Sequence, residues 1–215
     1  MIISPQRRYI FVHIPKTGGT SLAAALEERA ARDDILIGDT PTAKRRKARL
    51  KHLAPRGRLW KHSTLADVEG VVDPEDHFVF TLVRNPWDRM VSYYHWLRDQ
   101  TFAHPAVARA RSHDFRAFVA HSATIGAARA TPYGSYLRDS AGRERPATFL
   151  RLEHLDADLP PLEARLGLRI AMPRINRSAR RADFRSYYDA ESAQLVAEMA
   201  GEDVARWGYT FEKPQ

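Results

Sequence analysis

The sequence predicts an α/β protein: a three-layer, P-loop-like fold with a central, mostly parallel sheet flanked by helices. Three short apolar runs, at 8–14, 77–83 and 147–152, are typical of strands buried on both faces of a parallel sheet. The first two runs each lead into a helical pattern, and this alternation is typical of α/β folds. The composition is globular, with 44% hydrophobic and 10% aromatic residues. At this length we expect one domain, residues 1–215.

The elements of the first half follow from local signals. Residues 20–31 are rich in Ala and Leu and predict a helix, with Thr20 or Ser21 as its N-cap. Residues 38–58 are polar and basic and predict a loop or an exposed helix.

A second helix is predicted directly after the second strand. Asn85 is a good N-cap and Pro86 suits the first helical position. Apolar residues then recur at helical spacing: Trp87, Met90, Val91 and Tyr94. A short amphipathic helix is expected around 115–119. Residues 122–146 predict a loop with a hairpin turn at 140–142.

Two more helices are predicted after the third strand. One begins at Pro160-Pro161 and stops at Gly167, and the other is capped by Asp189 and ends at Gly201. No apolar run approaches the length of a transmembrane helix, and the N-terminus lacks the apolar core of a signal peptide. The chain has no cysteine, which excludes disulfides and zinc–thiolate sites. We expect a cytoplasmic protein, a location that includes the cytoplasmic face of a membrane.

Residues 10–22 join the first strand to the first helix through a turn that predicts an anion site. Backbone N–H groups point out of such a junction, and a helix N-terminus carries about half a positive charge. Gly18 and Gly19 let a phosphate or sulfate approach the backbone closely, and Lys16 adds a mobile positive charge. Three hydroxyl groups add further donors: Thr17, Thr20 and Ser21.

The turn is not a Walker A loop, in which the lysine follows the second glycine and precedes a Ser or Thr that holds Mg²⁺. Lys16 precedes both glycines, and no Walker B strand ending in Asp is found. A P-loop kinase-like phosphotransferase is therefore an alternative that lacks its metal ligands.

Two motifs follow one another in the chain. The turn at 15–21 is Pro-Lys-Thr-Gly-Gly-Thr-Ser, and the segment 81–94 combines a strand, Arg-x-Pro and then Arg-x-x-Ser-x-Tyr on a helix. In this order they resemble the 5′-phosphosulfate loop and the 3′-phosphate motif of sulfotransferases that use 3′-phosphoadenosine 5′-phosphosulfate (PAPS). The first motif is similar to that of the carbohydrate-type branch. The resemblance covers most of the chain and implies metal-independent sulfuryl transfer from PAPS to an acceptor hydroxyl, with an amine as the alternative acceptor group.

The resemblance also implies a role for each motif. Lys16 stabilises the charge that builds on the leaving oxygen of PAPS, and Arg84 with Ser92 binds the 3′-phosphate. Arg89 is either a third contact or a surface ion pair. The residues expected to bind the donor in the two motifs are Lys16, Thr17, Gly18, Gly19, Thr20, Ser21, Arg84 and Ser92.

A late loop, residues 174–181, is expected to close over the nucleotide, as in many sulfotransferases. Its candidate contacts are Asn176, Arg177, Ser178 and Arg181. It differs from the Arg-Lys-Gly loop of the cytosolic small-molecule sulfotransferases, which argues against a phenol or steroid acceptor.

His62 is the expected general base that takes the proton of the acceptor hydroxyl. It precedes the second strand, in a region where members of this branch often carry a histidine. The other candidates are His52, His13 and Glu153. His13 belongs to a strand, where a packed core histidine is the simpler interpretation, and Glu153 is more simply structural.

The charge distribution favours anionic partners. The net charge is +8, and no Asp or Glu occurs between Thr40 and Ala66. This stretch is either a solvated face or a surface for a saccharide acceptor with acidic groups, a lipid head group or an anionic membrane. A non-catalytic nucleic-acid or anion binder is the second alternative, although no aromatic-interleaved RNA motif is present.

Overall fold

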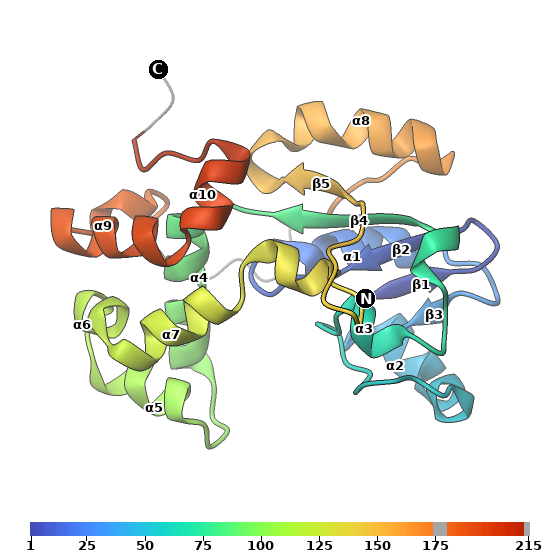
Figure 1. Ribbon diagram of the computed structural model, residues 1–215, viewed down its shortest axis with the longest axis horizontal. Coiled ribbons are helices and arrows are strands. Elements are labelled where there is room, and N and C mark those ends of the chain that lie inside the picture. Colours follow the sequence, from blue (N-terminus) through green and yellow to red (C-terminus); the bar gives the residue numbers. More distant parts are fainter. Residues whose placement is uncertain (174–179, 213–215) are drawn as a thin grey trace. The chain divides into compact units, whose positions relative to one another are not determined.

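The computed structural model describes residues 1–173 and 180–212. The chain divides into two compact units, Met1–Val83 with Tyr133–Asn176, and Arg84–Pro132 with Arg177–Gln215. The first unit contains the β-sheet and the second is helical (Figure 1).

The sheet of the first unit has five strands in the order β3-β1-β2-β4-β5 (Figure 1). The three predicted strands are β2 (Tyr9–Val12), β4 (Phe78–Val83) and β5 (Thr148–Arg151), and they pair in parallel as expected. Two short strands that the sequence analysis missed, β1 (Ile2–Ser4) and β3 (Ile35–Leu36), extend the sheet in antiparallel fashion. The sheet is therefore mixed, with parallel strands from its centre to the β5 edge.

Helices pack on both faces of this sheet, which confirms the three-layer α/β class. On one face, α1 (Gly19–Glu27) and α8 (Leu155–Leu166) contribute to a core with alternate strand residues such as Phe11 and Phe80. On the other face, a second core includes residues of α3 (Leu65–Val68) and of the 3₁₀ helix η3 (Tyr133–Leu137), together with intervening strand residues. Successive strand residues thus serve opposite faces.

Two helix starts in this unit differ from the prediction. Helix α1 begins at Gly19 with Gly18 as its N-cap in the left-handed region (φ 88°), so neither Thr20 nor Ser21 caps it. Helix α8 begins at Leu155, ahead of Pro160-Pro161, and ends before Gly167 as predicted. Acidic residues in its first turn complement the helix dipole, a signal that the prolines obscured.

The remaining elements of the first unit are short, and those of residues 38–58 lie where a loop or an exposed helix was expected. The basic segment forms α2 (Pro41–Arg46) and the 3₁₀ helix η1 (Lys47–His52). Two further 3₁₀ turns are η2 (Pro74–Asp76) and η4 (Leu152–His154). The hairpin turn predicted at 140–142 is confirmed, since the backbones of Arg138 and Glu144 form an antiparallel β-bridge across it.

The second unit is built around α4 (Pro86–Asp99). Its predicted start is confirmed, because the Asn85 side chain accepts a hydrogen bond from the Trp87 N–H. The other helices are α5 (Pro105–Ser112), α6 (Phe115–Ala120), α7 (Ser122–Ala130), the 3₁₀ helix η5 (Phe184–Tyr187), α9 (Ala190–Met199) and α10 (Gly201–Trp207). The predicted loop is wrong over α7, and α10 begins at Gly201, where we expected helical structure to end.

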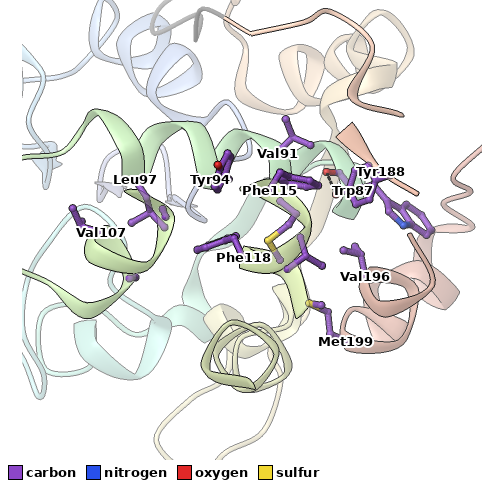
Figure 2. Packing of buried hydrophobic residues seen from close by; sticks show 14 of the residues in the cluster. Trp87, Val91, Tyr94, Leu97, Val107, Phe115, Phe118, Tyr188, Val196 and Met199 are labelled. Atoms are coloured by element: carbon purple, nitrogen blue, oxygen red, sulfur yellow. Dashed lines mark hydrogen bonds between the residues drawn. The ribbon is translucent and has the colours of Figure 1, made fainter. Parts of the chain in front are cut away.

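A single aromatic-rich core holds these helices together (Figure 2). Tyr94 of α4 packs against Phe115 and Phe118 of α6, with ring centroids 5.4 and 5.2 Å apart. The Tyr188 hydroxyl donates a 2.7 Å hydrogen bond to the Trp87 carbonyl. Within the described residues, no helix has the length and apolar character needed to cross a bilayer.

Candidate active site

The turn between β2 and α1 has the backbone shape of an anion-binding loop. Lys16 and Gly18 both adopt positive φ angles, 67° and 88°, whereas Thr17 between them does not, so the sign of φ alternates along the turn. Such alternation turns successive N–H groups toward a common concavity. No side chain caps α1 and its first turn carries no acidic residue, so the positive end of the helix dipole is not neutralised locally.

The buried side chain of Thr17 stabilises the loop through a hydrogen bond to the backbone that precedes it. It is fully buried, and its hydroxyl donates a 2.9 Å hydrogen bond to the Ile14 carbonyl. Any contact of Thr17 with an anion therefore has to come from its backbone N–H. Lys16, Thr20 and Ser21 are only partly buried.

His13 fixes the first residue of α1. Its ring is buried and stacks on Phe11, with centroids 5.8 Å apart. A Cβ atom at Gly19 would lie 2.2 Å from His13 Cδ2 and 2.6 Å from its Nε2. Gly19 is therefore required by close packing, whereas Gly18 is required by its φ angle.

His62 lies next to His13, the residue that packs against the first residue of α1. Its Nδ1 is 2.7 Å from the His13 carbonyl oxygen, and the two imidazole centroids are 4.6 Å apart. A carbonyl only accepts hydrogen bonds, so Nδ1 carries the proton. The neutral ring then has its lone pair on Nε2, the tautomer that a general base needs.

Burial keeps both histidines neutral. Desolvation lowers the pKa of His62 to about 4, against a smaller raising effect from its bond to the His13 carbonyl. The pKa of His13 is held well below its usual value, first by burial and then by nearby positive charges that include Lys16 and Lys61. Lys61 is itself paired with Asp39, with Nζ and Oδ2 2.6 Å apart.

The other candidate bases are placed differently. His52 is exposed at the end of η1, and Glu153 is exposed in η4. The neighbour of Glu153, Leu152, is the residue that contacts the loop, since its Cδ1 lies 2.9 Å from where a Gly18 Cβ would be. Among the four candidates, the structure brings only His62 and His13 together beside the loop.

A second positively charged cluster lies in the helical unit at the start of α4. Asp88 bridges two arginines, with its Oδ2 2.8 Å from Arg84 Nε and its Oδ1 2.6 Å from Arg180 Nη2. All three side chains are largely buried. The cluster therefore holds two guanidinium groups against one carboxylate and has a net positive charge.

The same face of α4 carries Ser92 and His95, one and two turns after Asp88. Ser92 is buried, and the positive charge of Arg180 contributes to a lowered pKa of His95, after burial. Two buried nitrogens of this cluster, Arg180 Nη1 and His95 Nε2, have no hydrogen-bond partner among the described residues. Buried polar atoms normally have hydrogen-bond partners, and a bound anion would accept hydrogen bonds from these two nitrogens.

The late loop lies mostly outside the described residues, and this includes Asn176, Arg177 and Ser178. Arg181 is described, and its guanidinium lies over the Tyr187 ring, 5.9 Å from the centroid. Arg180, which the sequence analysis did not single out, is the arginine that reaches Asp88. The sequence could not distinguish Arg180 from Arg181, because the two arginines are adjacent and no local pattern shows which of them reaches Asp88.

Comparison with known proteins identifies the family. Residues 1–140 match the model of the sulfotransferase family. The chain belongs to the sulfotransferase family. Among solved structures, this sulfotransferase is similar to mouse sulfotransferase SULT7A1 complexed with PAP, with a TM-score of 0.48 and 17% identity over 94% of this chain and 85% of that chain. No curated protein sequence matches it.

Family membership suggests what the β2–α1 loop and the cluster at the start of α4 do, because sulfotransferases act on an anionic donor. The match includes the β2–α1 loop, His62, Arg84 and Ser92, which lie within residues 1–140. It favours sulfuryl transfer over the kinase-like and non-catalytic alternatives. No group of three or more His, Asp or Glu side chains suited to a metal ion occurs in the part of the chain that the structure describes.

Proposed function

We propose that this sulfotransferase moves a sulfuryl group from PAPS to an acceptor hydroxyl by in-line displacement. The observation that carries the proposal is the β2–α1 loop, with its left-handed Lys16 and Gly18, inside a chain that matches the sulfotransferase family. The fit to PAPS is chemical, since this donor is anionic at both its 5′ and its 3′ end.

The 5′-phosphosulfate is assigned to the loop and the first turn of α1. The backbone of residues 17–20 supplies N–H donors, whereas the Ser21 N–H already bonds to the Gly18 carbonyl at 3.0 Å. The hydroxyls of Thr20 and Ser21 add to these donors. Lys16 is assigned to the bridging oxygen between phosphorus and sulfur. Charge grows on that oxygen as the bond breaks, so a cation there acts more strongly in the transition state than in the ground state.

The 3′-phosphate is assigned to the cluster at the start of α4. Arg84 and Ser92 are its expected ligands, and the buried Arg180 Nη1 supports Arg180 as another. Asp88 holds both guanidiniums in place, so a phosphate would meet arginines that are already ordered. Asn176, Arg177 and Ser178 remain further candidates for this phosphate from the late loop.

His62 is assigned as the general base. The acceptor oxygen forms a bond to sulfur, the bond from sulfur to the bridging oxygen breaks, and the acceptor proton passes to His62 Nε2. The Nδ1–H keeps its hydrogen bond to the His13 carbonyl and so stabilises the imidazolium that forms. Adenosine 3′,5′-bisphosphate leaves as the other product.

We further propose that the acceptor hydroxyl belongs to a saccharide or a lipid head group. The acid-free segment between Thr40 and Ala66 supports an acceptor or a surface with negative charge. The proposed location is the cytoplasm, either in solution or at the periphery of a membrane.

Calorimetry with adenosine 3′,5′-bisphosphate in the presence of EDTA tests the donor assignment. We expect one site per chain, weakened in Arg84→Ala and Arg180→Ala but not in Arg129→Ala, an exposed arginine on α7. Binding of ATP with Mg²⁺ but not of the bisphosphate would reject the proposal.

A further inference from the structure

The outer edge of the sheet carries an unusual concentration of exposed positive charge. Helix α2 and the 3₁₀ helix η1 pack beside the edge strand β3. Their exposed basic side chains are Lys44, Arg45, Lys47, Arg49 and Lys51. Across the described residues, no carboxylate forms an ion pair with Lys44, Lys47 or Lys51, so their charges are available to a partner.

The type of cation is also unusual for this chain. Four of its six lysines lie between 44 and 61, beside five arginines of the same stretch, whereas the cations of the rest of the chain are almost all arginines. These lysines are Lys44, Lys47, Lys51 and Lys61. Lysine acts as a flexible point charge and lacks the bidentate geometry with which arginine reads a defined phosphate or carboxylate. Exposed lysines therefore suit a diffuse anionic surface better than a single shaped ligand.

A cavity of about 900 Å³ lies beside η1 and contains both apolar and charged residues. Ile35, Leu36, Leu50 and Leu53 provide its apolar part. This combination of apolar walls and charge matches an amphipathic ligand, because hydrocarbon is stabilised by apolar contact while an ionic head needs a charged partner.

Arginines supply positive charge around the same cavity. Arg46 and Arg49 donate hydrogen bonds to the carbonyls of residues 31 and 32, which fixes both guanidiniums beside it. Two carboxylates also line the cavity. One, Asp34, is offset by Arg7 at 3.6 Å and by the N–H of residue 31, and the other, Asp33, is exposed.

An exposed tryptophan belongs to the same acid-free segment. Trp60 is 46% exposed and lies on a turn that the buried Ser63 hydroxyl holds by hydrogen bonds to the carbonyls of Arg58 and Trp60. The preceding residue, Leu59, and Leu50 of η1 both pack against the core on this face of the sheet. Tryptophan side chains favour the boundary between water and hydrocarbon.

We propose that this edge docks on an anionic lipid bilayer, with one lipid in the cavity beside η1. We call the surface the basic edge: Lys44, Arg45, Lys47, Arg49 and Lys51, together with the cavity and Trp60. The lipid phosphate faces Arg46 and Arg49, and its hydrocarbon lies along Leu50 and Leu53. The inference deepens the proposed peripheral location and does not depend on the donor chemistry.

Two features favour a bilayer over a polyanionic saccharide. The apolar walls of the cavity offer nothing to a sulfated or carboxylated sugar chain, whereas they match an acyl chain. Trp60 also provides an apolar contact of the kind found at bilayer surfaces. The ring of Trp60 lies 5.0 Å from that of His62, so docking at this edge brings the proposed base close to the head-group region.

Co-sedimentation of the full chain with vesicles tests the proposal. The vesicles are made of phosphatidylcholine alone or of equal parts phosphatidylcholine and phosphatidylglycerol. We expect binding only to the anionic vesicles. In the triple variant Lys44→Ala, Lys47→Ala, Lys51→Ala, binding should fall on the order of 100-fold at low salt, because each surface lysine contributes about a fivefold factor. The matched control Arg111→Ala, Arg129→Ala, Arg169→Ala removes equal charge elsewhere and should bind nearly as the wild type does.

The variant Leu53→Asn tests the cavity without changing charge. It should weaken binding to anionic vesicles several-fold and leave the salt dependence unchanged. Equal loss in the lysine triple and the arginine control would overturn the docking surface, and so would equal binding to both vesicles. Binding to heparin but not to anionic vesicles would show a polyanionic saccharide as the occupant. An unaffected Leu53→Asn would overturn the lipid in the cavity.

Calorimetry with adenosine 3′,5′-bisphosphate on the same variants separates this inference from the proposed function. The lysine triple and Leu53→Asn should bind the bisphosphate as the wild type does. Loss of vesicle binding with intact bisphosphate binding supports a separate docking surface. Simultaneous loss of both would overturn it, because it would show that the substitutions disturb the whole unit.

Discussion

At the scale of single residues, burial decides how the proposed base His62 responds to pH, and its hydrogen bond to the His13 carbonyl decides which ring nitrogen is the base. The base works only when Nε2 is unprotonated, so kcat/KM should rise with pH through the pKa of His62 in the free protein. Burial lowers that pKa to about 4. The rising limb of the pH–rate profile should therefore lie well below pH 6.5, the pKa of an ordinary histidine. A bound anionic donor raises the pKa, which should move the limb of kcat to higher pH.

His62→Ala should remove this limb and lower turnover by about 10²–10⁴-fold, the usual contribution of a general base. The measurement is a pH–rate profile of wild type and variant, with bisphosphate binding as the check on folding. His52→Ala, at an exposed position on η1, is the matched control and should keep the wild-type profile. Near-wild-type turnover in His62→Ala would transfer the role to His13 or Glu153.

Lys16 is the second residue whose role can be separated by kinetics. Lys16→Ala should lower kcat on the order of 10²–10³-fold, because it removes a donor that acts on developing charge, and it should change bisphosphate affinity much less. Arg129→Ala, which removes an exposed cation on α7, is the control and should leave both quantities unchanged. If Lys16→Ala altered only donor affinity, the lysine would be a ground-state contact.

At the scale of elements, the junction of β2 and α1 depends on the absence of a side chain at Gly19. A Cβ there would overlap His13, so Gly19→Ala should destabilise the chain by about 1–3 kcal/mol and weaken donor binding. Gly126 on α7 is the control, because its Cβ would meet nothing within 4 Å. Gly126→Ala should stabilise by about 0.5–1 kcal/mol through helix propensity. Urea unfolding measures both, and equal effects at the two sites would contradict the packing argument.

The sequence was sufficient to predict the elements that have strong local signals. The strands β2, β4 and β5 are continuous apolar runs, and the start of α4 is marked by Asn85-Pro86. The strands β1 and β3 are too short to show a period of their own, and they form because neighbouring strands pair with them. The N-cap of α1 was wrongly predicted because Gly18 closes the turn through its φ angle and no side chain is involved.

The candidate site was predictable to a similar degree. The sequence singles out Lys16, Gly18 and Arg84 because the types and spacing of these residues suit anion binding, and their roles stay predictions. The bridging role of Asp88 and the choice of Arg180 over Arg181 depend on contacts between segments about 90 residues apart. The protonation of His62 at Nδ1 depends on the carbonyl of another segment, which no local pattern reveals.

At the scale of the whole molecule, each unit has its own hydrophobic core. Phe118 is fully buried in the core of the helical unit, so Phe118→Ala should cost about 3–5 kcal/mol there. Hydrogen exchange followed by mass spectrometry should show faster exchange in α4, α6 and α9. The amides of β2 and β4 should keep their protection at moderate denaturant, since their cores contain other residues. Uniform loss of protection would indicate that the two units unfold together.

The close approach of Gly19 to His13 also constrains how related sequences can diverge. The two positions occupy one small volume, so a lineage that gains a side chain at position 19 must shrink or move the ring at position 13. A smaller residue at 13 would keep its backbone carbonyl and with it the orientation of His62. Homologues should therefore show compensating substitutions at 13 and 19, while the hydrogen bond from position 62 to the backbone carbonyl of position 13 persists through them.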